Sequence, residues 1–159
     1  MSATSDQPAP SKQTAAKASR VWFVAIAILA LGGMAVSAVS LERHYAKSAS
    51  AFCDFGERFN CDIVNRSEYS SLMGIPVAAI GIVGYGLLFA LATVYRERSE
   101  TPLRVLVAAF AGLAFALYLT YIEGHVLETW CILCLSSLAL VTMITVLAVG
   151  VKVRAGRSR

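Results

Sequence analysis

Four cysteines are the residues of this chain best suited to chemistry, and they fall into two pairs. Cys131 and Cys134 form a Cys-x-x-Cys pair in the segment ETWCILCLSS, about one helical turn apart. Cys53 and Cys61 lie earlier, with seven residues between them. Paired thiols support dithiol–disulfide exchange, in which a thiolate attacks a disulfide sulfur.

The Cys-x-x-Cys pair stands at the mouth of a long apolar run, because the chain carries no charge from Leu135 to Val151. If Thr129 caps this helix, both sulfurs lie in its first turns on one face. Unpaired N–H groups and the positive end of the helix dipole stabilise a thiolate there. At the edge of a bilayer, one sulfur can face water and the other can face membrane-soluble material, which suits an enzyme that passes electrons into the membrane.

Other uses of the cysteines compete with such a relay. Two structural disulfides would staple a loop to the membrane segments and make the chain a non-catalytic membrane subunit. A zinc site is a further alternative, although the first spacing is wide for a zinc knuckle. A c-type haem is excluded because no His follows the second cysteine of the Cys-x-x-Cys pair. We favour a relay in which the loop pair carries electrons from a soluble partner to the fixed pair, and we expect no metal site.

The composition predicts the elements that hold these cysteines. Hydrophobic residues make up 57% of the chain and charged residues only 15%. Four segments of at least 18 residues lack Asp, Glu, Lys and Arg: Val21–Leu41, Met73–Tyr95, Val105–Ile122 and Thr129–Val151. About 20 helical residues cross a hydrocarbon core of about 30 Å. The sequence therefore predicts an all-α integral membrane protein with spans at about 21–41, 74–94, 104–122 and 130–151.

The charge distribution orients these spans. The formal net charge is +4, and ten of the fourteen basic residues fall in 1–20, in the 95–104 loop or after residue 151. The positive-inside rule places these segments and both termini in the cytoplasm. All four cysteines then lie on the opposite side, where disulfides persist. The basic excess thus reflects topology and predicts no binding to nucleic acid.

The remaining segments connect or flank the spans. Residues 1–20 lack aromatic side chains and are expected to form a disordered cytoplasmic tail, and 152–159 a basic cytoplasmic tail. Cleavage of the first span as a signal peptide is an alternative, although its apolar run is long for that. The segment EGHVLE, which contains His125, is expected to be a short solvated loop.

The long outward loop between the first two spans is expected to contain a short amphipathic helix. Its apolar residues recur at three- and four-residue spacings: Phe52, Phe55, Phe59 and Ile63. Such a helix would rest on the membrane surface or over the helices.

The stretch CDFGERFNCDIVNRSEYSSLMGIPVAAIGIVGY, followed later by WCILCLSS, resembles bacterial homologues of vitamin K epoxide reductase. The resemblance runs from about Val21 to Val151. It implies a four-transmembrane-helix bundle around a quinone of ubiquinone, menaquinone or vitamin K type, which acts as electron acceptor. The implied task is that of the Dsb membrane oxidases: a thiol:quinone oxidoreductase in the bacterial cytoplasmic membrane that supports disulfide bond formation.

The same resemblance assigns roles to individual residues. Cys53 would exchange with a separate thioredoxin-like, DsbA-like soluble partner, and Cys61 would relay electrons to Cys131. Cys134 would face the quinone, and Ser67 matches the family serine placed near the quinone ring. Vertebrate members carry a Tyr four residues after the last active cysteine, where this chain has Leu138. This departure favours plain quinone reduction over reduction of vitamin K epoxide.

Overall fold

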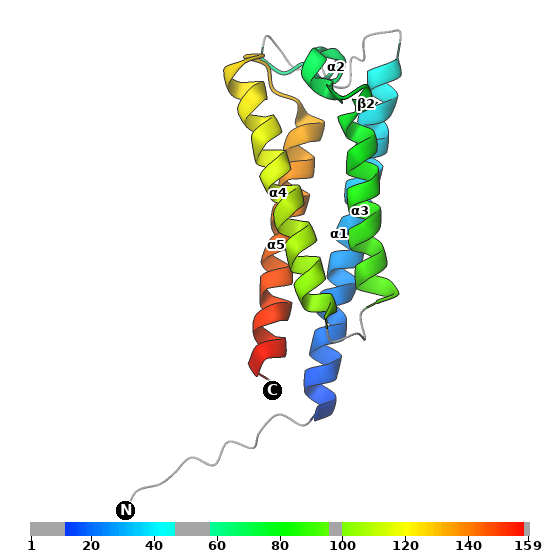
Figure 1. Ribbon diagram of the computed structural model, residues 1–159, viewed down its shortest axis with the longest axis vertical. Helices are drawn as coiled ribbons and strands as arrows, with labels where there is room; N and C mark the ends of the chain where they lie inside the picture. The colour runs from blue at the N-terminus through cyan, green and yellow to red at the C-terminus, as the bar shows by residue number, and fades with distance from the viewer. Residues whose placement is uncertain (1–11, 47–57, 96–99, 158–159) are drawn as a thin grey trace, which may run out of the picture.

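The structure, a computed structural model, describes residues 12–46, 58–95 and 100–157 and is built from four long helices that lie side by side (Figure 1). They are α1 (Lys12–Tyr45), α3 (Val77–Thr93), α4 (Thr101–His125) and α5 (Ile132–Arg157). Helix α1 packs against α3 and α5, and α4 packs against α5 and α3. The start of α1 and the end of α5 therefore lie at the same end of the molecule.

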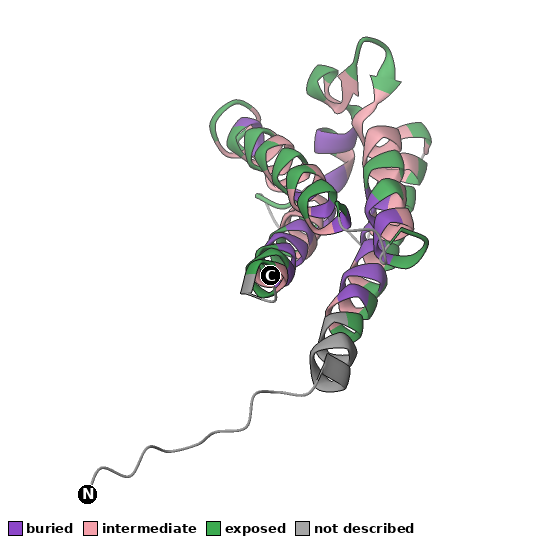
Figure 2. Cartoon of the chain, turned by 60° about the horizontal axis from the view of Figure 1, so that its bottom comes forward, coloured by how far each residue is buried: buried purple, intermediate pink, exposed green. Residues whose placement is uncertain are grey.

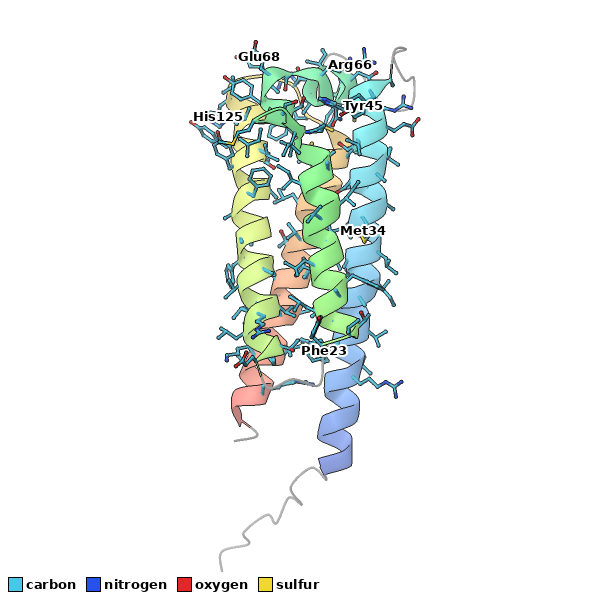
Figure 3. All side chains as sticks on the ribbon, turned by 45° about the vertical axis from the view of Figure 1, so that its right-hand side comes forward. Phe23, Met34, Tyr45, Arg66, Glu68 and His125 are labelled. Carbon is cyan, nitrogen blue, oxygen red and sulfur yellow. The ribbon has the colours of Figure 1, made fainter. Side chains whose placement is uncertain are left out.

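Short elements cover the opposite end of the helices. They are α2 (Cys61–Arg66), the 3-10 turn η1 (Glu68–Ser70) and the antiparallel strands β1 (Ser71–Leu72) and β2 (Ile75–Pro76). The turn between the strands uses Met73 and Gly74, both with positive φ. Figure 3 shows Arg66, Glu68 and His125 at this end, far from Phe23.

The helices have the length and surface of membrane spans. Within the described residues, three are long and apolar enough to cross a membrane, namely Arg20–Tyr45, Thr101–His125 and Ile132–Gly156, with mean hydropathies of 2.2 to 2.5. The apolar helix α3 is shorter. Exposed residues cover the outer faces and buried residues line the contacts between helices (Figure 2). The exposed faces carry apolar side chains such as Val83, Val107 and Val146, so the chain is an all-α membrane protein.

Helix α1 begins earlier than the sequence analysis expected. Residues 1–11 lie outside the described residues, but the chain is helical from Lys12 onward, within the segment expected to be disordered. The sequence KQTAAKASR contains several good helix formers, and it directly precedes an apolar helix from which the helical conformation can propagate. Helix α5 likewise continues through the basic segment after residue 151 as far as Arg157.

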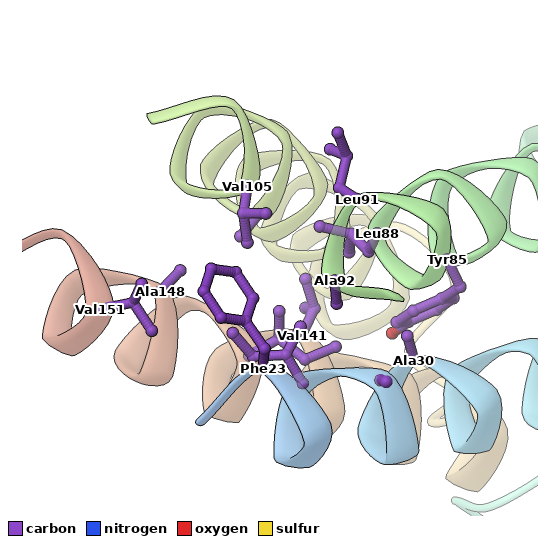
Figure 4. Close-up of a cluster of buried hydrophobic side chains, with 14 residues drawn as sticks. Phe23, Ala30, Tyr85, Leu88, Leu91, Ala92, Val105, Val141, Ala148 and Val151 are labelled. Carbon is purple, nitrogen blue, oxygen red and sulfur yellow. The ribbon is translucent and has the colours of Figure 1, made fainter. Parts of the chain in front are cut away.

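The core between the helices is a cluster of aliphatic and aromatic side chains that includes Phe23, Val105 and Val141 (Figure 4). Tyr85 of α3 lies at one end of this cluster, with its ring against the backbone of Gly33 in α1. Its hydroxyl donates a hydrogen bond of 2.9 Å to the carbonyl of Ser137 in α5. Tyr85 thereby joins three of the four long helices.

Replacing Gly33 with Ala should loosen this junction. A Cβ at Gly33 would lie 2.3 Å from the Tyr85 ring, so α1 and α3 must move apart or the ring must leave its position. Overpacking of this kind costs about 1–3 kcal/mol, and thermal unfolding in detergent should show the loss. The matched control is Gly32→Ala, whose Cβ would meet only Leu140 at 3.8 Å. Equal stability of the two variants would contradict this packing.

Candidate active site

Two backbone hydrogen bonds tie residues 58–60, directly before α2, to the segment before the Cys-x-x-Cys pair. The Trp130 N–H donates to the carbonyl of Arg58 at 2.8 Å, and the Asn60 N–H donates to the carbonyl of Trp130 at 3.1 Å. These bonds form an isolated parallel bridge between Phe59 and Trp130. Two segments far apart in the sequence are thereby fixed side by side.

Helix α2 starts directly after this bridge and places Cys61 at its first position. The Asn60 side chain caps the helix by accepting hydrogen bonds from the N–H groups of Asp62 and Ile63. The expected amphipathic helix is therefore shorter than its spacing suggested: Phe59 lies before it, and Phe52 and Phe55 lie outside the described residues. The backbone pairing of Phe59 with Trp130 replaces a helical conformation there.

The bridge brings Cys61 and Cys131 into one buried cluster with Val64 and Leu133. Cys61 is 1% exposed and Cys131 is 0% exposed. Cys61 is disulfide-bonded, whereas Cys131 and Cys134 carry free thiols. The structure thus brings three of the four predicted cysteines to one end of the helices, and Cys53 lies outside the described residues.

Cys131 occupies the cap of α5, a place that the sequence analysis gave to Thr129. The helix begins at Ile132, and the carbonyl of Cys131 accepts the N–H of Leu135 at 3.0 Å. Thr129 is held elsewhere, because its N–H donates to the carbonyl of Glu123 at 3.2 Å. The Cys131 sulfur is therefore presented directly to the unpaired N–H groups of the first turn.

This position favours the thiolate of Cys131. Its pKa lies below the ordinary value, chiefly because the Cys134 thiol donates a hydrogen bond to it. The N–H groups of Cys134 and Leu133 add to this effect, while burial and the charge of Glu123 oppose it. Cys131 is the more nucleophilic thiol in this arrangement.

Cys134, by contrast, lines a cavity of ≈ 410 Å³ between the helices. The cavity walls are mostly aliphatic and aromatic, with contributions from α1, α3, α4 and α5. Tyr85 and Ser137 line it as well, joined by a hydrogen bond. The two thiols of the pair therefore face different surroundings: Cys131 faces Cys61, and Cys134 faces the cavity.

A polar network closes the cavity beneath α2. Ser67, the residue matched to the family serine, lines the cavity, and its hydroxyl donates to the carbonyl of Val64 at 2.8 Å. Ser40 donates to the Asn65 side chain at 2.5 Å, and His44 Nδ1 lies 2.6 Å from the Asn65 carbonyl. These polar atoms lie at the end of the cavity that α2 covers.

Asn65 is a site residue that the sequence analysis missed. Its side-chain N–H group donates to the carbonyl of Cys61 at 2.9 Å and lies 3.7 Å from the Cys131 sulfur. Its position four residues after Cys61, one helical turn along α2, is the signal that would have placed it beside Cys61.

Glu123 is the second missed residue. It was assigned to a loop, but α4 continues to His125, and Glu123 is only 2% exposed. Its Oε2 accepts the Cys131 N–H at 3.1 Å. Its place directly after the third uncharged run gave no signal of burial, because a charged residue there usually marks the membrane surface. His125, which was expected in a solvated loop, is the last residue of α4; it is exposed and stacks on Tyr121 with ring centroids 4.4 Å apart.

Apolar helices that carry a dithiol at a helix terminus, beside a cavity between those helices, define a membrane protein built for redox chemistry. A comparison with protein-family models supports this class: the vitamin K epoxide reductase family matches residues 24–149. The chain belongs to this family, and it is a membrane oxidoreductase. The matched range contains all four cysteines, Ser67, Asn65 and Glu123.

Proposed function

We propose that this protein is a membrane thiol:quinone oxidoreductase that oxidises a soluble thioredoxin-like, DsbA-like partner and so supports disulfide bond formation. The observation that carries the proposal is the position of the Cys131–Cys134 pair. Cys131 shares a buried cluster with Cys61, while Cys134 lines the cavity. A pair in this position connects the outward loop to the interior between the helices.

The relay balances as two successive disulfide exchanges. The partner's dithiol reduces the Cys53–Cys61 disulfide and becomes a disulfide itself. The Cys61 thiolate then attacks Cys131 of the oxidised inner pair, and Cys53 attacks Cys61 to release the reduced pair. Two electrons and two protons now reside on Cys131 and Cys134. Their re-oxidation to a disulfide releases both electrons and both protons, which a quinone held in the cavity would take up.

The residues that line the cavity fit a quinone as acceptor. Its volume of ≈ 410 Å³ falls within the usual range of about 300–1,000 Å³ for small-molecule sites. Apolar walls suit a quinone ring and tail, and Ser67, Tyr85 and Cys134 place polar atoms on them. A bound quinone of ubiquinone, menaquinone or vitamin K type would supply the capacity to take up two electrons and two protons. With Leu138 in place of the vertebrate Tyr, we expect reduction of quinone and not of vitamin K epoxide.

We further propose that α3 spans the membrane with the three longer helices, in a four-helix bundle around the quinone. Both termini would then face the cytoplasm, in a bacterial inner membrane, and the cysteines would face the periplasmic side. Two observations support this orientation. The start of α1 and the end of α5 lie at one end of the molecule, and ten of the fourteen basic residues fall in segments assigned to that side.

Reconstitution tests the function directly. The purified chain is mixed with a reduced thioredoxin-like protein and a quinone, and both partner oxidation and quinol formation are measured. We expect one quinol for each partner disulfide, with no oxidation when either the quinone or the chain is omitted. If the disulfides instead resisted the partner's dithiol and the quinone stayed oxidised, the chain would be a non-catalytic subunit with structural disulfides.

A further inference from the structure

The proposed relay gives no role to one buried acidic side chain, Glu123. Glu123 is almost completely buried at the outer end of α4, where an ionisable side chain is costly unless it is used or paired. Only one of its carboxyl oxygens is accounted for, since Oε2 accepts the Cys131 N–H at 3.1 Å. Oε1 is buried and has no hydrogen-bond partner within the described part of the chain.

Glu123 lies beside the Cys131–Cys134 dithiol. The carboxyl group lines the same cavity as Cys134, and the Cys134 thiol lies close enough to interact with it, although no hydrogen bond of normal geometry reaches Oε1. The Trp130 ring packs against Gly124, the next residue of α4. The other titratable side chains that line the cavity are His44, Tyr69 and Tyr85.

From this geometry we propose that Glu123 is the proton-accepting residue of the dithiol, and that its free Oε1 takes the proton of the Cys134 thiol as the Cys131–Cys134 disulfide forms. This inference rests on the proposed function. It explains why a carboxyl group is held with one oxygen fixed and the other unoccupied beside a thiol that must lose its proton.

Two protons leave the dithiol as the Cys131–Cys134 disulfide forms. The Cys134 thiol loses its proton to Glu123, and the Cys131 thiol loses its proton to solvent at the outer end of the site. The Cys131–Cys134 bond forms with release of two electrons into the cavity. The protonated Glu123 donates its proton toward the acceptor in the cavity, and a second proton enters from solvent. Glu123 thus returns to its carboxylate form after each turnover.

A purely structural role makes a different prediction for the same residue. If Glu123 served only to anchor the Cys131 N–H, then Gln would replace it well, because the amide oxygen accepts the same hydrogen bond at the same chain length. Gln cannot take up a proton, so the Glu123→Gln variant separates the two roles. Glu128→Gln, an exposed position in the same connection, is the matched control.

We expect Glu123→Gln to reduce quinone about 10²–10⁴-fold more slowly than the unsubstituted chain, the usual range for the loss of a general base. Glu128→Gln should keep the normal rate. A second readout needs no quinone: the thiolate absorbance of the reduced pair is followed against pH in a Cys53→Ser, Cys61→Ser background. Because the charge of Glu123 raises the pKa of Cys131, its removal should let the thiolate appear at lower pH. The variant would then hold more thiolate and yet turn over more slowly.

Normal quinone reduction by Glu123→Gln would overturn the inference, and so would slow turnover with an unchanged thiolate titration. If the Gln variant does not fold, Glu123→Asp is used to separate the proton-accepting role from the structural one. It keeps the charge but withdraws the carboxylate by one methylene. Slow turnover that recovers at high pH, where hydroxide can take the thiol proton instead, supports the inference; a normal rate, or a rate that is slow at every pH, contradicts it. A failure of the proposed function is distinguishable, because the unsubstituted chain would then also fail to reduce quinone.

Discussion

Cys134→Ser is expected to abolish quinone reduction, by about three orders of magnitude or more, as for other residues that form the reacting bond. Cys134 lines the cavity and is the thiol of the pair that faces its interior. Without it, Cys131 has no nearby sulfur on the cavity side with which to form a disulfide. Under the proposed function, electrons from Cys61 would then have no path to the cavity, whatever the reductant.

The measurement is quinol formation driven either by a protein dithiol or by dithiothreitol. Ser136→Ala, two positions further along α5, is the control, because its hydroxyl only bonds the carbonyl of Ile132 within the same helix. Cys131→Ser should also block transfer from the loop, but it leaves Cys134 facing the cavity, where a thiolate against a quinone ring can give a visible charge-transfer band. Quinone reduction that survived in Cys134→Ser would overturn this division of roles.

The helices and the place of Cys131 and Cys134 at the start of a helix could be predicted from the sequence, because long uncharged runs and the Cys-x-x-Cys spacing are strong local signals. In a chain of this composition, long runs without charge are typical of membrane-spanning helices, and each run overlaps one of the four long helices of the structure. The Cys-x-x-Cys spacing likewise predicted a pair in the first turn of a helix. The cap was misplaced by two residues, because the sequence did not show that the Thr129 N–H is bound to the carbonyl of Glu123.

The surroundings of the sulfurs could not be predicted, because they depend on contacts between distant segments. The Phe59–Trp130 bridge joins the loop to the start of α5, and neither segment contains a sequence feature that predicts it. Asn65 approaches the Cys131 sulfur only because of that bridge. Glu123 was assigned to a loop, since a charged residue at the end of an apolar run usually marks the membrane surface. Its burial follows from one further turn of α4 and from the Cys131 N–H that it accepts.

A second large loss of activity is expected when the loop pair, Cys53 and Cys61, is changed. Cys61 is 1% exposed and directly follows the Phe59–Trp130 bridge, so the thiolate of a folded protein partner cannot reach its sulfur. Under the proposed function the partner must therefore react with Cys53. Cys53→Ser should abolish oxidation of a thioredoxin-like protein, and the measurement is the appearance of the partner's disulfide.

The double variant Cys53→Ser, Cys61→Ser shows whether the Cys131–Cys134 pair still works without the loop cysteines. Cys53→Ser alone leaves a free Cys61 thiol that can be trapped on Cys131, since both lie in one buried cluster. The double variant Cys53→Ser, Cys61→Ser removes this trap. It should still reduce quinone when dithiothreitol, a reductant small enough to reach the inner disulfide, replaces the protein. An ordered relay requires both results: a Cys53→Ser chain that oxidised its protein partner at the normal rate would show that electrons enter the inner pair without the loop.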